Sequence, residues 1–335
     1  MDASHRQQRA ALLLSRSTVE RLLTPDECID AVETAFRQHA LGTVASPGVL
    51  GMHVPGGGFH VKAASLTLDR PYFAAKLNAN FPQNSARANL PTIQGVVALC
   101  DAENGTPLAV MDSMALTALR TAAATAVAAK YLAREGSRTL LICGCGAQAA
   151  AQLRALLRVR PFARVLVYDL DAKKAQDFAA AAREEALEAS PVQDLAPAVA
   201  ASDVVITCTT AQRYFIERKM VKPGTFVAGV GADNEHKQEL DPLLLAASIV
   251  VADSLDQAAT IGDLHHAIDA KIMSRDDVHA ELGQVIAGLR RGRSSDDQTI
   301  VFDSTGTALQ DVAAAAVVYR RAVEDADAVR FAFHA

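Results

Sequence analysis

The second half of the chain alternates short, β-branched apolar runs with helical stretches, and this alternation constrains the fold more than any other feature. Such runs are typical of strands buried on both faces of a sheet, with helices covering both faces. They occupy residues 139–143, 165–168, 204–208, 226–230, 249–252 and 300–302. We therefore predict an α/β fold with a Rossmann-type, doubly wound parallel sheet.

The first of these runs leads into a glycine-rich turn. Gly144, Gly146 and Ala149 form the pattern G-x-G-x-x-A before an Ala/Leu-rich helical stretch. In a dinucleotide site the first glycine allows a tight turn and the second lets backbone approach a pyrophosphate. The small third residue lets the helix pack closely against the strand. The alternative is an ordinary strand-to-helix turn without a ligand.

Asp169 ends the second run, where a dinucleotide site places an acidic residue. A carboxylate there accepts hydrogen bonds from the ribose hydroxyls and repels a 2′-phosphate, which favours NAD. The nearby Lys173 and Lys174 leave NADP open. The predicted cofactor contacts are Gly144, Cys145, Gly146, Ala147, Gln148, Asp169, Thr209, Val230 and Ser304.

The first third of the chain mixes element types. Thr24 before Pro25, with Glu27 at the capping-box position, predicts a helix over residues 25–39. Strand-like runs at 60–62, 72–77 and 93–100, separated by turn residues, predict an antiparallel sheet. An Ala-rich helix is expected over 114–134 and a last helix over 307–325. These segments predict a separate α+β domain.

Composition and charge argue against several classes of protein. The 335 residues carry 33 Lys and Arg against 38 Asp and Glu, so no basic surplus is available for nucleic acid. Charged residues interrupt every long apolar stretch, so none reaches the roughly 18–20 residues that span a bilayer. The first residues, with Arg6 and Arg9 and few apolar neighbours, predict no signal peptide.

The five cysteines form no disulfide pattern. Their number is odd and several lie in apolar runs, which indicates a reducing compartment, and we expect a cytoplasmic location. Cys143 and Cys145 resemble a metal or redox pair. Because no further Cys or His stands at ligand spacing, we interpret them as small apolar fillers and predict no metal.

Three cations stand in apolar surroundings. Arg120 projects from a helical stretch of small residues, so it meets either a structural carboxylate or an anionic ligand. Lys76 lies in the run YFAAKLNANFP, with Phe73, Ala75 and Leu77 on the opposite face of the strand. Such a lysine is either solvated or functional, and Lys62 in HVKAA leaves the same two alternatives.

Two further segments follow predicted parallel strands. Asp233 comes after the run 226–230, and ligands of such sheets bind outside the carboxyl ends of the strands. An ordinary loop aspartate is the alternative. Ser304, Thr305 and Gly306 follow the last run, where the hydroxyls either contact a ligand or cap the final helix.

Five separated blocks resemble the ornithine cyclodeaminase and mu-crystallin family. They are KLNANFPQNSARANLPTIQGVVAL, GTPLAVMDSMALTALRTAAATAVAA, GCGAQA, GVGADNEHKQELD and VFDSTGTALQD, in this order and spacing. The resemblance implies a homodimer joined through the N-terminal sheet with the C-terminal helix, a nicotinamide-binding Rossmann domain and an active site between the domains. We expect a substrate-binding and dimerisation domain of residues 1–118 with 308–335, and an NAD(P)-binding domain of residues 119–307.

The resemblance also implies roles for residues at matching motif positions. Arg120 and Lys76 would hold the substrate carboxylate, Lys76 would also transfer a proton, and Asp233 would handle the substrate nitrogen or a proton. Thr92 would line the pocket. The expected catalytic residues are Lys76, Arg120 and Asp233, and the expected substrate contacts are these three with Lys62, Thr92, Ser304 and Gly306.

One departure from the family pattern affects the expected reaction. Cyclodeaminases of the family carry Pro-Arg in the early segment, whereas this chain reads Ser46-Pro47-Gly48, and Lys62 is a hypothetical replacement for the missing cation. We therefore expect an NAD(P)-dependent oxidoreductase acting at the Cα of an amino acid, or reducing a ketimine such as pyrroline-2-carboxylate. Redox-neutral ammonia elimination to a cyclic amino acid is one alternative. A non-catalytic, mu-crystallin-like binding protein for cofactor and small ligand is the other.

Overall fold

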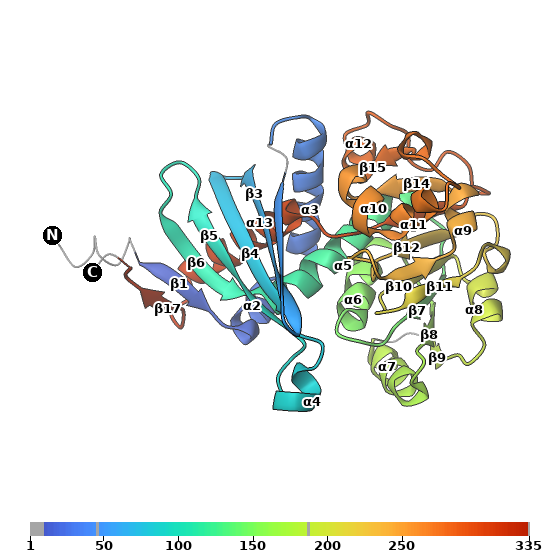
Figure 1. Ribbon diagram of the computed structural model, residues 1–335, viewed down its shortest axis with the longest axis horizontal. Helices are drawn as coiled ribbons and strands as arrows, with labels where there is room; N and C mark the ends of the chain where they lie inside the picture. Colours follow the sequence, from blue (N-terminus) through green and yellow to red (C-terminus); the bar gives the residue numbers. More distant parts are fainter. Residues whose placement is uncertain (1–9, 45–46, 186–187, 334–335) are drawn as a thin grey trace. The chain divides into compact units, whose positions relative to one another are not determined.

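The computed structural model describes residues 10–44, 47–185 and 188–333 (Figure 1). The chain divides into two compact units, Met1–Arg120 with Thr307–Ala335, and Thr121–Gly306. The boundary falls inside helix α5, Ser113–Leu132. Of the residues on which the signal-peptide expectation rests, Arg6 and Arg9 lie outside the described residues, as does Ser46, whereas the short apolar run at 12–14 belongs to strand β1, Ala11–Leu14.

The first unit is built on a mixed sheet with the strand order β17-β1-β6-β5-β4-β3-β2 (Figure 1). Neighbouring strands are antiparallel except for β1 and β6, which are parallel. Besides the start of α5, its elements are β1 Ala11–Leu14, α2 Arg16–Leu22, α3 Pro25–Ala40, β2 Gly48–Val54, β3 Gly57–Thr67, β4 Pro71–Asn80, α4 Asn84–Ala88, β5 Ile93–Asp101, β6 Pro107–Asp112, α13 Ala308–Val323 and β17 Val329–Phe331.

Local sequence signals explain where these elements begin and turn. The Thr24 hydroxyl accepts the Glu27 amide at 3.4 Å, and the predicted helix over 25–39 is confirmed as α3. The predicted antiparallel strands are confirmed as β3, β4 and β5, all longer than expected. Of Gly56, Gly57 and Gly58, which were expected to form a turn before the run at 60–62, only Gly56 lies in the turn, because Gly57 and Gly58 already pair with Val54 and His53 in a hairpin. Gly56, at φ +86°, supplies the turn that leaves β2 paired with β3.

The two faces of this sheet differ in what packs against them. Helix α13 packs against β3, β4 and β5 on one face and also contacts α3. The opposite face carries a row of apolar side chains in register across four strands, Leu50, Val61, Leu77 and Val96. Leu50 is 59% exposed, Leu77 42% and Val96 43%, so this chain alone leaves the row open to solvent.

The second unit is a doubly wound sheet of parallel strands, as predicted, in the order β15-β14-β16-β12-β10-β7-β8-β9. Besides the end of α5, its elements are β7 Thr139–Cys143, α6 Ala149–Val159, β8 Arg164–Tyr168, α7 Ala172–Glu184, β9 Glu188–Pro191, α8 Leu195–Ala201, β10 Val204–Thr207, β11 Gln212–Ile216, η1 Arg218–Met220, β12 Phe226–Gly229, β13 Gln238–Leu240, α9 Pro242–Ala246, β14 Ile249–Ala252, α10 Leu255–Ile261, α11 Asp263–Asp269, η2 Arg275–Asp277, β15 Ala280–Glu281, α12 Leu282–Ile286 and β16 Ile300–Asp303.

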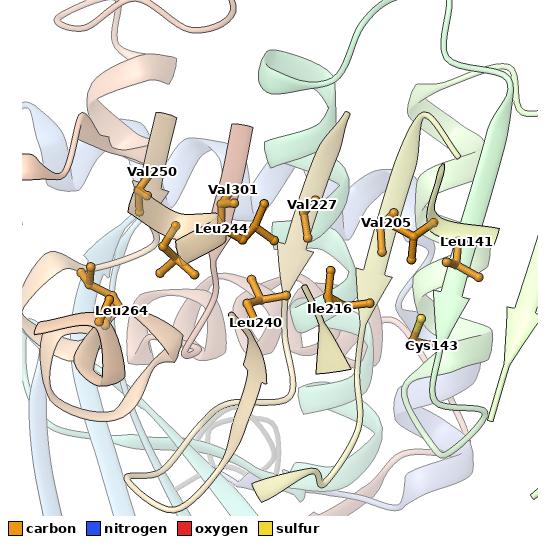
Figure 2. Close-up of a cluster of buried hydrophobic side chains, with 14 of the residues drawn as sticks. Leu141, Cys143, Val205, Ile216, Val227, Leu240, Leu244, Val250, Leu264 and Val301 are labelled. Atoms are coloured by element: carbon orange, nitrogen blue, oxygen red, sulfur yellow. The ribbon is translucent and has the colours of Figure 1, made fainter. Parts of the chain in front are cut away.

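Each β-branched run of the sequence becomes a strand of this sheet, with ends that shift by at most a residue. Figure 2 shows Leu141, Val205, Val227, Val301 and Val250 from five of these strands in one buried cluster. Side chains from the helices and from β11 and β13 cover them. This rigid core fixes the strand ends and the loops that follow them. Among the described residues, no helix is both long and apolar enough to cross a membrane.

Candidate active site and cofactor site

The turn after β7 has the geometry that the glycine pattern predicts. Gly144 adopts φ +96°, a conformation that favours glycine, and a Cβ there would lie 2.8 Å from the Cys208 carbonyl oxygen. Gly146 is exposed, and a Cβ built on it would meet no atom within 4 Å. The turn therefore packs tightly against the end of β10 on one side and is open on the other. An open glycine turn at the start of a helix fits a bound pyrophosphate.

Two polar groups support this interpretation of the turn. Helix α6 begins without a side-chain cap, because Gln148 makes no capping hydrogen bond, and the Gln148 Oε1 atom is buried without a partner among the described residues. Asp169 follows β8 and accepts the Cys145 amide at 2.7 Å. The acid predicted from its position after the second strand thus lies directly beside the glycine turn. These residues fit an adenosine ribose and a pyrophosphate.

A buried carboxylate, Glu239, ties together the loops after β10 and β12. Its oxygens accept the Thr209 amide and hydroxyl, both at 2.6 Å, and the Thr207 hydroxyl and Gly231 amide, both at 2.7 Å. Burial raises the pKa of Glu239, although these hydrogen bonds oppose the rise. Thr209 was predicted to contact the cofactor, and Glu239 is what fixes its position.

Glu239 belongs to a series of buried acids, with Asp263 at the start of α11 and Asp303 at the end of β16. Asp263 accepts the Glu239 and Leu240 amides at 2.7 and 3.0 Å. Asp303 accepts the Leu264 amide at 2.8 Å, and burial raises the pKa values of both aspartates. Each of these carboxylates thus accepts hydrogen bonds from the backbone amides of a neighbouring segment. These bonds fix the loops around the proposed cofactor site.

The other predicted residues of the second unit have mixed surroundings. Val230 is buried after β12, and its amide donates to the Thr207 carbonyl at 2.9 Å. Ser304 is buried, and its hydroxyl has no partner within the described ranges. Gly306 donates its amide to Asp253 at 2.6 Å. Asp233 is 52% exposed and accepts Lys237 Nζ at 2.7 Å, as an ordinary loop aspartate also would.

The alternative that Ser304 and Thr305 cap the final helix is wrong. Helix α13 begins after Thr307, which makes no side-chain capping bond. The Thr305 hydroxyl donates instead to Asp253 at 2.9 Å. The Ser304 hydroxyl is therefore left without a structural role among the described residues.

In the first unit, Lys76 and Arg120 meet at one carboxylate. Lys76 Nζ lies 2.9 Å from Asp311 Oδ2, and Arg120 Nε lies 3.0 Å from Asp311 Oδ1. Arg120 Nη1 also donates to Gln310 Oε1 at 2.7 Å. Lys76 and Arg120 are each 4% exposed and Asp311 is 1% exposed. Lys76 is therefore buried rather than solvated, and Arg120 meets a structural carboxylate.

The topology explains why these groups converge. Lys76 lies on the face of β4 that α13 covers, and its neighbours in register across the sheet include Val97 and Met111, both almost fully buried. Lys62 stands directly opposite Lys76 on β3, on the same face. Two lysines thus interrupt an otherwise apolar row, and Asp311 on α13 faces them.

Electrostatics in this cluster disfavour charge on Lys76. Burial, followed by the Arg120 charge, lowers the pKa of Lys76 to about 7, and Lys62 adds to the effect while Asp311 opposes it. Burial alone would raise the pKa of Asp311, but Lys76 and Arg120 outweigh it and the pKa lies below its usual value. The cluster thus contains an amine that can gain or lose a proton near neutral pH.

Thr92, another predicted substrate contact, and Gly48, the position that departs from the family pattern, lie in other parts of the first unit. Thr92 is exposed just before β5, and its carbonyl accepts the Phe81 amide at 2.8 Å. Gly48, where the family carries arginine, pairs with Ala63 on β3. Lys62 pairs with Val49, the residue after Gly48. Because side chains alternate along a strand, Lys62 lies next to position 48 but on the opposite face of the sheet.

The sequence analysis missed Asp311, Gln310 and Glu239. A signal for Asp311 was present, since it is a single acid in the Ala- and Val-rich helix 308–318. The argument that singled out Arg120 applies equally to it. Glu239 carried no comparable signal, because it stands in a polar segment. Among the described residues, no group of His, Cys, Asp and Glu has the arrangement of a metal site.

Comparison with known proteins places this geometry in context. A model of the ornithine cyclodeaminase/mu-crystallin family matches residues 9–326. Alanine dehydrogenase of Archaeoglobus fulgidus is 40% identical over 314 residues, covering 93% of this chain and 95% of that protein.

Solved structures show the same relationship. An archaeal alanine dehydrogenase dimer with bound NAD superimposes with a TM-score of 0.93 at 38% identity, covering 97% of this chain and 99% of that one. Thermococcus litoralis Δ1-pyrroline-2-carboxylate reductase, solved with NADH and L-proline, has a TM-score of 0.89 at 32% identity, covering 95% and 99%.

Proposed function

Because the chain belongs to the ornithine cyclodeaminase/mu-crystallin family, we propose that it is an NAD-dependent oxidoreductase acting on small amino and imino acids. It transfers hydride between the nicotinamide and the Cα of an α-amino acid or of the corresponding imino acid. The observation that carries this proposal is the pair of buried cations, Lys76 and Arg120, that share the single carboxylate of Asp311. A buried guanidinium beside an amine that can take up a proton near neutral pH is suited to binding a carboxylate.

On the substrate side, Arg120 and Lys76 bind the carboxylate by charge-assisted hydrogen bonds. These contacts orient the α-carbon, and they withdraw electron density from an adjacent imine carbon, which favours hydride addition. Lys76 exchanges a proton with the substrate, since its pKa of about 7 matches that task. Asp233 steers the substrate nitrogen, Thr92 lines the pocket, and Lys62 replaces the arginine missing at Gly48.

On the cofactor side, the glycine turn 144–149 holds the pyrophosphate and Asp169 holds the ribose. The bound nicotinamide gives or accepts the hydride. Thr209 and Val230, fixed through Glu239 and the strand ends, line the nicotinamide side, and the unpaired Ser304 hydroxyl offers a further contact to cofactor or substrate, with Gly306 beside it. Asp169 disfavours a 2′-phosphate, so we propose NAD rather than NADP.

The two units have separate tasks in this proposal. The first unit, with the α13 segment, binds substrate and joins two copies into a homodimer, and the second unit binds the cofactor. The open apolar face containing Leu50, Leu77 and Val96 is the proposed dimer surface. All five cysteines are free thiols, which suits a reducing cytoplasm.

The test is a screen for oxidation of NADH and NADPH with pyrroline-2-carboxylate, its six-membered homologue, and pyruvate with ammonia. The wild-type protein is expected to oxidise NADH with at least one of these. The Arg120→Ala variant should lose about 30-fold or more in kcat/KM, since one good charged contact is worth on the order of 2 kcal/mol. Arg37→Ala, a half-exposed surface arginine paired with Glu33, is the matched control and should retain full activity.

Three results would contradict the proposal. Release of ammonia from a diamino acid without net NADH consumption would indicate a redox-neutral cyclodeaminase. NADH binding without turnover of any substrate would indicate a binding protein. Full kcat/KM in Arg120→Ala would show that the carboxylate binds elsewhere.

A further inference from the structure

Asp311 and Gln310 occupy some, but not all, of the donors of the two cations. Arg120 Nη1 donates to Gln310, whereas Nε lies 3.0 Å from Asp311 Oδ1 as an ion pair and makes no hydrogen bond among the described residues. Within the described part of the chain, its Nη2 group has no acceptor. Lys76 Nζ donates to Asp311 Oδ1 at 3.0 Å and to the Thr117 hydroxyl at 3.5 Å, and it lies 2.9 Å from Asp311 Oδ2, which accepts no hydrogen bond among the described residues. One edge of the guanidinium therefore stays available while its orientation is fixed.

The charges of this cluster balance in two ways. Without substrate, Arg120 and Asp311 form a neutral pair if Lys76 is uncharged. With a substrate carboxylate, two negative groups face Arg120 and Lys76, and this buried set is neutral only if Lys76 is protonated; Lys62 is half-buried, so water screens its charge. Because all three side chains are buried, an unbalanced charge would be costly in either state. Electroneutrality therefore links the proton on Lys76 to the substrate carboxylate.

The groups around Lys76 are consistent with this linkage. It faces Lys62 from β3, Arg120 from α5 and Asp311 from α13, and together with burial these hold its pKa at about 7. Cys28 of α3 lies near Arg120, but burial raises the pKa of this thiol to about 12, so it stays neutral. An added carboxylate would raise the pKa of Lys76, because a nearby negative charge favours the ammonium form.

We propose that Asp311 is a positioning residue that holds Arg120 and Lys76 so that their remaining donors converge on the substrate carboxylate, and that this carboxylate binds together with one proton on Lys76. The inference rests on the proposed function of this site as a carboxylate-binding site. It assigns Asp311 a task that a merely structural counter-ion would not have, since Asp311 sets how many protons accompany the substrate.

The test measures proton uptake during binding, without hydride transfer. The probes are L-proline and pyrrole-2-carboxylate, neither of which can accept a hydride, titrated calorimetrically into the NADH-loaded full-length protein near pH 8, in two buffers with different ionisation enthalpies. The wild type should take up about one proton per bound carboxylate. In Asp311→Asn, the probe carboxylate alone balances Arg120, so uptake should fall towards zero. Its kcat/KM in the imino acid assay should fall at least 10-fold.

Two further variants separate this role from folding. Asp311→Glu keeps the charge and should restore much of the uptake, even if Asp311→Asn folds poorly. Gln310→Met is the matched control on the same helix. It removes the hydrogen bond to Arg120 without changing charge, so activity should decrease while proton uptake remains near that of the wild type.

The outcomes distinguish this inference from the proposed function. Proton-linked binding without turnover leaves the role of Asp311 standing and overturns the oxidoreductase. The inference alone is overturned if Arg120→Ala lowers turnover but binding to the wild type takes up no proton. It is also overturned alone if Arg120→Ala lowers turnover but Asp311→Asn takes up as many protons as the wild type. Failure of both probes to bind the wild type overturns the inference as well, because the site would not be one for carboxylates.

Discussion

At the scale of single residues, Lys76 determines the pH dependence that we expect. Its pKa of about 7 lies below that of an ordinary lysine because burial and the Arg120 charge disfavour the ammonium form. In the reductive direction of the proposed reaction, only protonated Lys76 would both hold the carboxylate and donate a proton. The value of kcat/KM should therefore fall as pH rises above about 7, since this parameter reports groups of the free enzyme. A pH profile with NADH and an imino acid measures it.

Neighbouring variants check that assignment. Lys62→Met removes a like charge that lowers the pKa of Lys76, so the decline should move to higher pH. Lys76→Met should lose most activity, and the kcat/KM that remains should no longer fall as pH rises above about 7. A profile that declines at the same pH in Lys62→Met as in the wild type would show that another group titrates.

Residues that act alone were easier to predict from sequence than residues that act in pairs. Gly144 and Asp169 follow from local spacing, and Arg120 is conspicuous as a cation among small groups. Asp311 is separated from Lys76 by 235 positions, so no local pattern connects them. The sequence therefore predicted two cations and missed the anion that positions both.

At the scale of elements, Glu239 on β13 connects the ends of β10 and β12. It accepts four hydrogen bonds inside the core, whereas an amide in its place keeps only one acceptor oxygen. Glu239→Gln should lower the free energy of unfolding by about 2 kcal/mol or more and weaken NADH binding, because Thr209 and Gly231 lose their anchor. Thermal unfolding and NADH fluorescence titration measure the two effects.

The same substitution nearby provides the control. Glu235→Gln, at a half-exposed position in the loop before β13, should change stability by no more than about 0.5 kcal/mol and leave NADH binding intact. Equal effects of the two variants would contradict the role of Glu239 as an anchor.

The strands of the second unit could be predicted because each is buried on both faces and reads as a continuous apolar run. Strand β2 could not, because six of its seven residues are exposed and the glycines beside it resembled a loop. Strands β1 and β17 are short and have little local signal. Their pairing with each other joins the two ends of the chain, which no periodicity reveals.

At the scale of the whole molecule, the open face of the first sheet predicts self-association. A row of apolar side chains across four strands, of which Leu50, Leu77 and Val96 are exposed and Val61 is half-buried, is unfavourable in water and suits a second copy of the same face. The protein should elute as a dimer, at twice the 35.4 kDa of one chain. Leu77→Asp places a charge in the middle of this row and should give monomers in light scattering.

Leu243→Asp is the matched control, since Leu243 is also half exposed but lies on α9 in the second unit. It should leave the dimer intact. A Leu77→Asp protein that stays dimeric, or a wild-type protein that is monomeric at micromolar concentration, would contradict the assignment of this face.

The first unit is built from two separate segments of the chain, and this also affects the order in which the protein folds during synthesis. Residues 121–306 are contiguous and can fold as soon as they leave the ribosome, whereas the first sheet lacks α13 until the last stretch of the chain has been translated. Until then Lys76 and Arg120 have no Asp311, and one face of β3, β4 and β5 has no helix to cover it. The first unit is thus completed last although it is begun first, so a message that stops before codon 307 would yield a folded second unit attached to an unfinished, aggregation-prone sheet.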